Sequence, residues 1–100
     1  MQKLVLGFYK YKKDTDVINI KNIGTFDSVK NIYRKTNQLL GIADLLVLKK
    51  PGIVAFVELK VGKNKQSLHQ LAFEQRCKDL GIKYKLCYTF DETISYINKL

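Results

Sequence analysis

Two carboxylates interrupt the most apolar part of this 100-residue sequence. Asp44 stands within the apolar run of residues 42–48, and Glu58 stands near the end of a second apolar run, residues 53–59. Burying a carboxylate is costly unless a cation or hydrogen-bond donors compensate its charge, and perturbed acids of this kind cluster at functional sites. The two acids are therefore the first candidates for chemistry.

The spacing of the two runs predicts how these acids are placed. Pro51 and Gly52 lie between the runs and form a turn signal, so we expect a β-hairpin with a five-residue loop. The expected register pairs three sets of residues: Leu48 with Val54, Leu46 with Phe56, and Asp44 with Glu58. Because strand side chains alternate with a period of two, Asp44, Glu58 and Lys60 should project from one face.

Two like charges directly opposite each other destabilise a sheet, so this arrangement calls for a cation between them. The candidates are the ammonium group of Lys60 and a divalent metal ion bound by hard oxygen ligands. Two simpler explanations stay open, in which the acids point into solvent at the strand ends or Lys60 alone neutralises them.

The rest of the sequence supplies the elements that must hold this hairpin. Before it we expect a hairpin of strands 4–11 and 17–20, then a segment 26–40 that fits either a helix or a strand through 31–36. After it we expect a polar loop 61–66, a helix 67–80 ended by Gly81, a strand 83–88 and a helix 91–100. This order predicts an α/β fold with a mixed β-sheet, a central hairpin and flanking helices.

The charge balance indicates the kind of partner. The chain has 18 Lys and Arg against 9 Asp and Glu, a formal net charge of +9, and such an excess favours binding to a polyanion such as nucleic acid. Of the 18 basic residues, 16 are Lys and only two are Arg. Lysine fits contacts to the phosphate backbone better than base readout, which arginine supplies. An AT-rich genome would produce the same lysine bias without any selection for binding.

Size and composition exclude several classes of protein. One hundred residues suit a single domain, residues 1–100, and 46% hydrophobic content is too high for a disordered basic tail. The sequence has no apolar run of about 18 residues and its start is too broken by charge for a signal peptide, so we expect a soluble, cytoplasmic protein without membrane contact.

Cys77 and Cys87 form no CxxC motif and His69 is the single histidine, which disfavours a disulfide scaffold or a zinc site. Both thiols should be reduced.

A set of these features together resembles a known family. The features are Gly41-Ile42-Ala43-Asp44, the hairpin, Glu58-Leu59-Lys60, a glycine-containing polar loop and Gln70 on the following helix. They resemble the VRR-NUC branch of the PD-(D/E)xK nuclease superfamily, over about residues 41–88. The resemblance implies a restriction-endonuclease-like fold and a metal-dependent phosphodiesterase that acts on DNA, of a kind that phages encode and that replication and repair proteins contain.

The resemblance also implies roles for individual residues. Asp44, Glu58 and the backbone carbonyl of Leu59 would bind Mg²⁺ or Mn²⁺. Lys60 would position or deprotonate the attacking water, and Gln70 would hydrogen-bond a water or the phosphate. Cleavage would leave a 5′-phosphate and a 3′-hydroxyl.

Several of these residues have simpler alternatives. Ser67 and Gln70 have the spacing of an S-x-x-Q capping box, in which Gln70 would bond only the start of its own helix. Yet Gln70 shares a helical face with Phe73, Cys77 and Leu80, which turns it toward the sheet. Three lysines are candidates for contacts to the DNA backbone, or belong to ordinary solvated loops: Lys35, Lys63 and Lys65.

The sequence also departs from the family pattern. No Glu precedes Glu58, whereas many family members carry one on an N-terminal helix, and Ala43 stands where the family has proline. The missing acid puts a second metal site and full activity in doubt.

The leading hypothesis is a metal-dependent endonuclease, selective for branched DNA such as a Holliday junction or flap. A chain this small would act as a homodimer that presents two sites. The alternatives are a non-catalytic nucleic-acid-binding module with the same fold, or a phage protein that inhibits a host factor.

Overall fold

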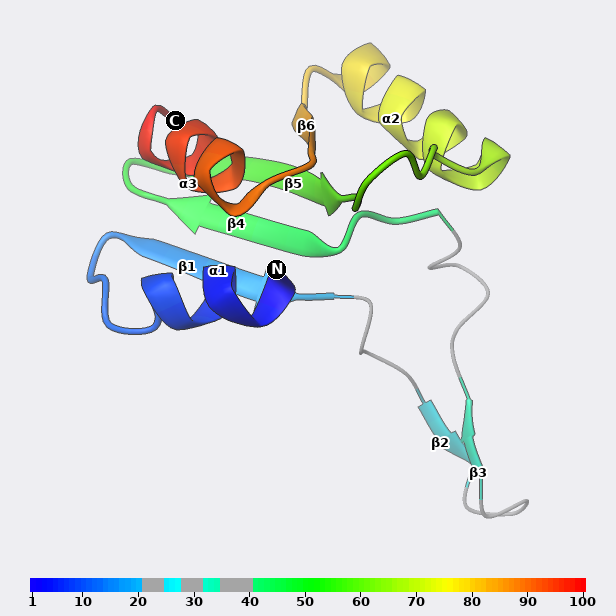
Figure 1. The fold of residues 1–100 in the computed structure, drawn as a ribbon, viewed down its shortest axis with the longest axis horizontal. Coiled ribbons are helices and arrows are strands. Elements are labelled where there is room, and N and C mark those ends of the chain that lie inside the picture. Colours follow the sequence, from blue (N-terminus) through cyan, green and yellow to red (C-terminus); the bar gives the residue numbers. More distant parts are fainter. Residues whose placement is uncertain (21–24, 28–31, 35–40) are drawn as a thin grey trace.

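The computed structural model describes residues 1–20, 25–27, 32–34 and 41–100 (Figure 1). Three helices and six strands lie in these residues: α1 Gln2–Tyr9, β1 Thr15–Asn19, β2 Thr25–Asp27, β3 Ile32–Arg34, β4 Leu45–Lys49, β5 Ile53–Leu59, α2 Leu68–Leu80, β6 Lys83–Cys87 and α3 Phe90–Asn98.

The main sheet has four strands in the order β1-β4-β5-β6. β4 is antiparallel to both β1 and β5, while β6 runs parallel to β5 and is reached through the crossover helix α2. β2 and β3 form a second, two-stranded antiparallel sheet. The predicted α/β class with a mixed sheet, a central hairpin and flanking helices is confirmed.

The predicted register of the central hairpin is confirmed as well. Leu46 lies opposite Phe56 and Leu48 lies opposite Val54. The pairing ends at Leu45 and Val57, so β4 begins three residues later than the predicted run. At the turn, Lys49 pairs with Ile53, so the expected five-residue loop is wrong and the loop is residues 50–52.

Helices cover both faces of the sheet. α1 and α3 pack on one face, where Val5 and Ile97 join the buried strand residues Leu45, Val47 and Val57 in one core cluster. α2 packs on the other face through aromatic contacts, in which the ring of Phe73 lies 5.0 Å from that of Phe56 and 6.1 Å from that of Tyr84.

The prediction of a strand over residues 4–11 is wrong, because this segment forms the helix α1. Val5 and Tyr9 are buried, whereas Leu4 and Phe8 are exposed. Positions four apart lie on the same side of a helix, so this burial pattern has a helical period and not the period of two that a strand requires. The N-terminal β-hairpin is therefore absent, and β1 pairs with β4 instead.

The remaining elements agree closely with expectation. α2 is capped by Ser67 and ends at Gly81, whose φ of +73° lies in the left-handed region that favours glycine. β6 and α3 form where the sequence predicts them. Of the two alternatives for residues 26–40, the strand is confirmed at Ile32–Arg34, and the other positions of that segment, apart from Phe26 and Asp27 in β2, lie outside the described residues.

Candidate active site

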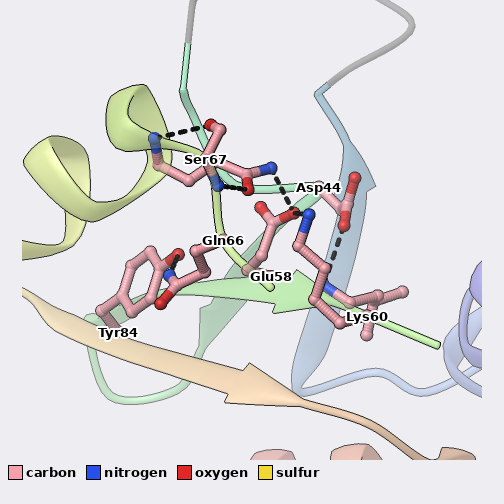
Figure 2. A network of polar contacts seen from close by, with 8 residues as sticks. Asp44, Glu58, Lys60, Gln66, Ser67 and Tyr84 are labelled. Atoms are coloured by element: carbon pink, nitrogen blue, oxygen red, sulfur yellow. Dashed lines mark hydrogen bonds and ion pairs between the residues drawn. The ribbon is translucent and has the colours of Figure 1, made fainter. Parts of the chain in front are cut away.

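Asp44 is the residue directly before β4, at the end of the hairpin that lies away from the turn. Its Oδ2 accepts a hydrogen bond of 2.8 Å from the backbone N–H of Leu59 (Figure 2). Its backbone carbonyl accepts one of 3.0 Å from the N–H of Ile20. Asp44 therefore contacts both neighbouring strands, and its carboxylate lies beside the Glu58-Leu59-Lys60 segment.

Glu58, on β5, is fully buried. The ammonium nitrogen of Lys60 lies 3.9 Å from Oε1 of Glu58, and the Lys60 side chain is only 18% exposed. This largely desolvated ion pair places a cation at the predicted position. Neutralisation by Lys60, one of the explanations that the sequence left open, is thus part of the site.

Gln70 connects the start of α2 to this buried acid. Its Oε1 accepts a hydrogen bond of 2.8 Å from the N–H of Ser67, and its own N–H donates to Oγ of Ser67 at 3.2 Å, which together form a capping box. Its Nε2 donates a hydrogen bond of 2.9 Å to Oε1 of Glu58. The capping box is therefore confirmed, and the same side chain also faces the sheet, where it bonds Glu58; a bond from Gln70 to a water or to the phosphate stays a prediction. Cys77 is buried on the same helix as expected, but Leu80 is exposed and does not share the packed face.

Gly41 has a structural reason for its place just before Asp44. Its φ is +79°, and a Cβ at this position would overlap the backbone carbonyl of His69 in the first turn of α2. Only glycine allows the chain leading into β4 to approach α2 this closely. This close approach brings Gln70 within reach of Glu58.

Tyr84 and Gln66 form a pair beside the site that the sequence analysis missed. Nε2 of Gln66 donates a hydrogen bond of 2.9 Å to the hydroxyl of Tyr84 (Figure 2). Burial, and secondarily the negative charge of Glu58, raises the pKa of the Tyr84 hydroxyl. The pair fixes the end of the loop after Lys60 to β6. The contact depends on the parallel register of β5 and β6, which places Tyr84 opposite Phe56, two residues before Glu58 on the same face.

The donor set of the site suits a hard divalent cation. Asp44 and Glu58 could supply carboxylate oxygens, and Leu59, between Glu58 and Lys60, could supply a backbone carbonyl. Among the described residues no group of three or more His, Cys, Asp or Glu side chains could hold a metal ion. A site with two protein carboxylates fits Mg²⁺, which usually keeps several waters and takes only one or two carboxylates from the protein.

The lysines predicted to contact DNA differ in what the structure says of them. Lys63 and Lys65 are exposed in the loop between β5 and α2, on the chain that follows Lys60. Lys35 lies outside the described residues. In the part of the chain that is described, no helix is long and apolar enough to cross a membrane.

Comparisons with known proteins bear on the fold. No family model matches the chain, and no curated protein matches it. A solved structure described as "VRR_NUC domain" superposes with a TM-score of 0.66 at 21% sequence identity, covering 97% of this chain and 89% of that one. The chain therefore has a VRR-NUC-like fold.

Proposed function

We propose that this chain is a divalent-metal-dependent DNA endonuclease. The observation that carries the proposal is the buried carboxylate of Glu58, held by Gln70 at 2.9 Å and by Lys60 at 3.9 Å, next to Asp44 in a VRR-NUC-like fold. A buried acid with a dedicated cation and amide is typical of a functional site, because stability alone rarely favours burying a charge.

Asp44, Glu58 and the carbonyl of Leu59 are the groups that would hold Mg²⁺ or Mn²⁺. When bound, such an ion lowers the pKa of water and offsets negative charge on a phosphate. Gln70 keeps the carboxylate of Glu58 in one orientation, so the donor atoms are fixed before substrate arrives.

Lys60 has the position and charge to act on the reacting groups. Its ammonium group can orient the attacking water and stabilise the charge that develops on the phosphate oxygens. The water oxygen bonds to phosphorus and releases one proton to solvent, the bond from phosphorus to the 3′ oxygen breaks, and that oxygen takes up a proton from solvent. The products are a 5′-phosphate and a 3′-hydroxyl.

The proposed binding of DNA depends on the positive charge of the chain. The net charge of +9 and the exposed Lys63 and Lys65 beside the site favour contacts to the DNA backbone, and Lys35 is proposed as a further contact. Lysine-rich contacts of this kind do not read the base sequence, which fits selectivity for the structure of branched DNA. A homodimer would present two active sites to such a substrate.

The test is cleavage of plasmid and of synthetic four-way and flap DNA in Mn²⁺. Lys60→Ala and addition of EDTA should each abolish cleavage, whereas Lys78→Ala, at an exposed position on α2, should cleave as the unsubstituted chain does. Circular dichroism establishes that each variant is folded. Undiminished cleavage by folded Lys60→Ala, or in EDTA, would show that this mechanism is wrong.

A non-catalytic nucleic-acid-binding module is the second candidate. The observation that favours it is the acid content, since no Glu precedes Glu58 and the described residues contain no group of three metal-binding side chains. This candidate predicts binding of branched DNA without product at every concentration of protein and Mn²⁺.

A further inference from the structure

α1 and the residues after it carry exposed aromatic and aliphatic side chains. Leu4 is 63% exposed, Phe8 is 41% exposed, and Tyr11, just after the helix, is 84% exposed. The opposite side of the helix, with Val5 and Tyr9, packs into the core. Leu4 and Tyr11 therefore leave most of their surface available for binding, whereas Phe8 offers part of its ring and also packs on Tyr9 and Phe90, whose ring centroids lie 4.9 and 6.1 Å away.

Lysines surround these rings. Nζ of Lys12 lies 5.0 Å from the centroid of the Phe8 ring, and Nζ of Lys10 lies 5.5 Å from that of Tyr11. Lys3 and Lys13 are exposed in the same segment, and α1 contains no acidic residue. We call the set of Leu4, Phe8, Lys10, Tyr11 and Lys12 the α1 surface.

We propose that the α1 surface binds single-stranded nucleic acid, with bases stacked on Tyr11 and Phe8 and phosphates contacted by the lysines. The proposal rests on the proposed function, to which it adds a contact for the unpaired strand of a branched substrate. Aromatic side chains with interspersed cations are the combination that sequence-independent single-strand binding uses, because every base has a π face and every nucleotide carries a phosphate.

The chemistry of the α1 surface distinguishes this partner from others. A purely apolar partner would leave the charges of Lys10 and Lys12 uncompensated, whereas a nucleotide supplies a flat apolar face and a negative charge together. The surface is also separate from the candidate active site, since α1 packs on one face of the sheet and α2, with Gln70, packs on the other (Figure 1).

The test is binding of fluorescein-labelled oligo(dT) to the full chain in EDTA, followed by fluorescence anisotropy over a series of salt concentrations. Tyr11→Ala should raise Kd about fivefold or more, as expected for loss of a stacked base. Tyr11→Phe should bind like the unsubstituted chain, and Tyr11→Leu, which keeps apolar area without a π system, should bind like Tyr11→Ala. Leu80→Ala, at an exposed apolar position on α2, is the matched control and should not change Kd.

Two further measurements isolate the contributions of stacking and charge. Lys12→Ala should reduce the slope of log K against log salt by about 0.7, the value for one phosphate contact to a single strand. The chain contains no tryptophan, so Tyr11→Trp introduces a single indole, whose fluorescence oligo(dT) should quench. Blunt duplex DNA should quench it much less, because its bases are already stacked.

Specific outcomes would overturn the proposal. The first is an unchanged Kd for Tyr11→Ala, and the second is binding by Tyr11→Leu as tight as that of the unsubstituted chain. The third is conversion of a dimer to a monomer by Tyr11→Ala with oligo(dT) binding intact, which would make the α1 surface a contact between copies of the chain. Equal loss of binding to anionic lipid vesicles and to oligo(dT) would also overturn it. Binding in EDTA needs no cleavage, so a chain that binds through Tyr11 without cutting contradicts only the nuclease proposal.

Discussion

Nε2 of Gln70 donates a hydrogen bond of 2.9 Å to Oε1 of Glu58, while Oε1 of the same Gln70 amide accepts one of 2.8 Å from the N–H of Ser67. One side chain therefore joins the first turn of α2 to the buried acid of β5. A shift of the helix start would move the Glu58 carboxylate, or would break this link.

Replacing Gln70 should cost more stability than removing the helix cap alone. Ser67→Ala removes the cap oxygen and should lower the free energy of unfolding by about 1 kcal/mol. Gln70→Ala leaves the cap oxygen of Ser67 in place but removes both side-chain bonds of Gln70, the one from the N–H of Ser67 and the one to the charged Glu58, so it should cost roughly 2–4 kcal/mol. Urea denaturation of both variants measures the difference. A loss for Gln70→Ala no larger than that for Ser67→Ala would contradict a large contribution of the bond between Gln70 and Glu58 to stability.

Two substitutions of Asp44 should separate its structural role from its charge. Asp44→Asn keeps an oxygen that can accept from the N–H of Leu59, so stability should change by less than about 1 kcal/mol, whereas Asp44→Ala leaves that donor without this acceptor and should cost about 1–3 kcal/mol.

Metal binding should depend on the charge of Asp44. Mn²⁺ at about 100 times its Kd should stabilise the unsubstituted chain by about 2.7 kcal/mol. Both Asp44→Asn and Asp44→Ala should lose most of this gain, which thermal unfolding with and without Mn²⁺ measures. A full Mn²⁺-dependent rise in Tm for Asp44→Asn would remove Asp44 from the metal site.

The central hairpin could be predicted in detail because local chemistry determines it. Pro51 and Gly52 mark the turn, and the alternation of apolar residues then determines the register and brings Asp44 near Glu58. The capping box, and the orientation of Gln70 toward the sheet, were likewise visible in the spacing of Gln70 from Ser67 and from Cys77 along one helix.

Two features depend on contacts that are distant in the sequence, and these could not be predicted. The apolar residues near the N-terminus are compatible with a helix or a strand, and packing of Val5 and Tyr9 against the core decides for the helix α1. The pair of Gln66 and Tyr84 requires β6 to lie parallel to β5, which only the crossover through α2 establishes.

Stability should fall more steeply at alkaline pH because of Tyr84. Burial and then the charge of Glu58 raise its pKa above the ordinary value of about 10. The unfolded chain therefore releases this proton at a lower pH than the folded chain. The stabilising contribution is fully present below about pH 10 and is lost as pH rises from there toward the folded pKa.

Tyr84→Phe should make that alkaline decrease shallower. The pKa values of Tyr9 and Tyr96 are also raised by burial, so part of the decrease should remain. Free energies of unfolding at several pH values, each taken relative to the same variant at pH 8, separate ionisation from loss of the hydrogen bond to Gln66. Parallel curves for the variant and the unsubstituted chain would contradict the assignment to Tyr84.

Adding one methyl group at Gly41 should damage the site without touching an acid. The new Cβ would overlap the backbone of His69 in α2, and the positive φ of Gly41 strains any other residue. Relief of the overlap requires α2 to move away from the chain before β4, which would lengthen the bond between Gln70 and Glu58. Gly41→Ala should therefore destabilise the fold and reduce any cleavage in Mn²⁺ even where it remains folded.

Gly7→Ala is the matched control, because a Cβ at Gly7 meets nothing within 4 Å and alanine within a helix should stabilise the chain by about 0.4–1 kcal/mol. If Gly41→Ala were as stable and as active as Gly7→Ala, the close approach of Gly41 to α2 would not be what positions Gln70.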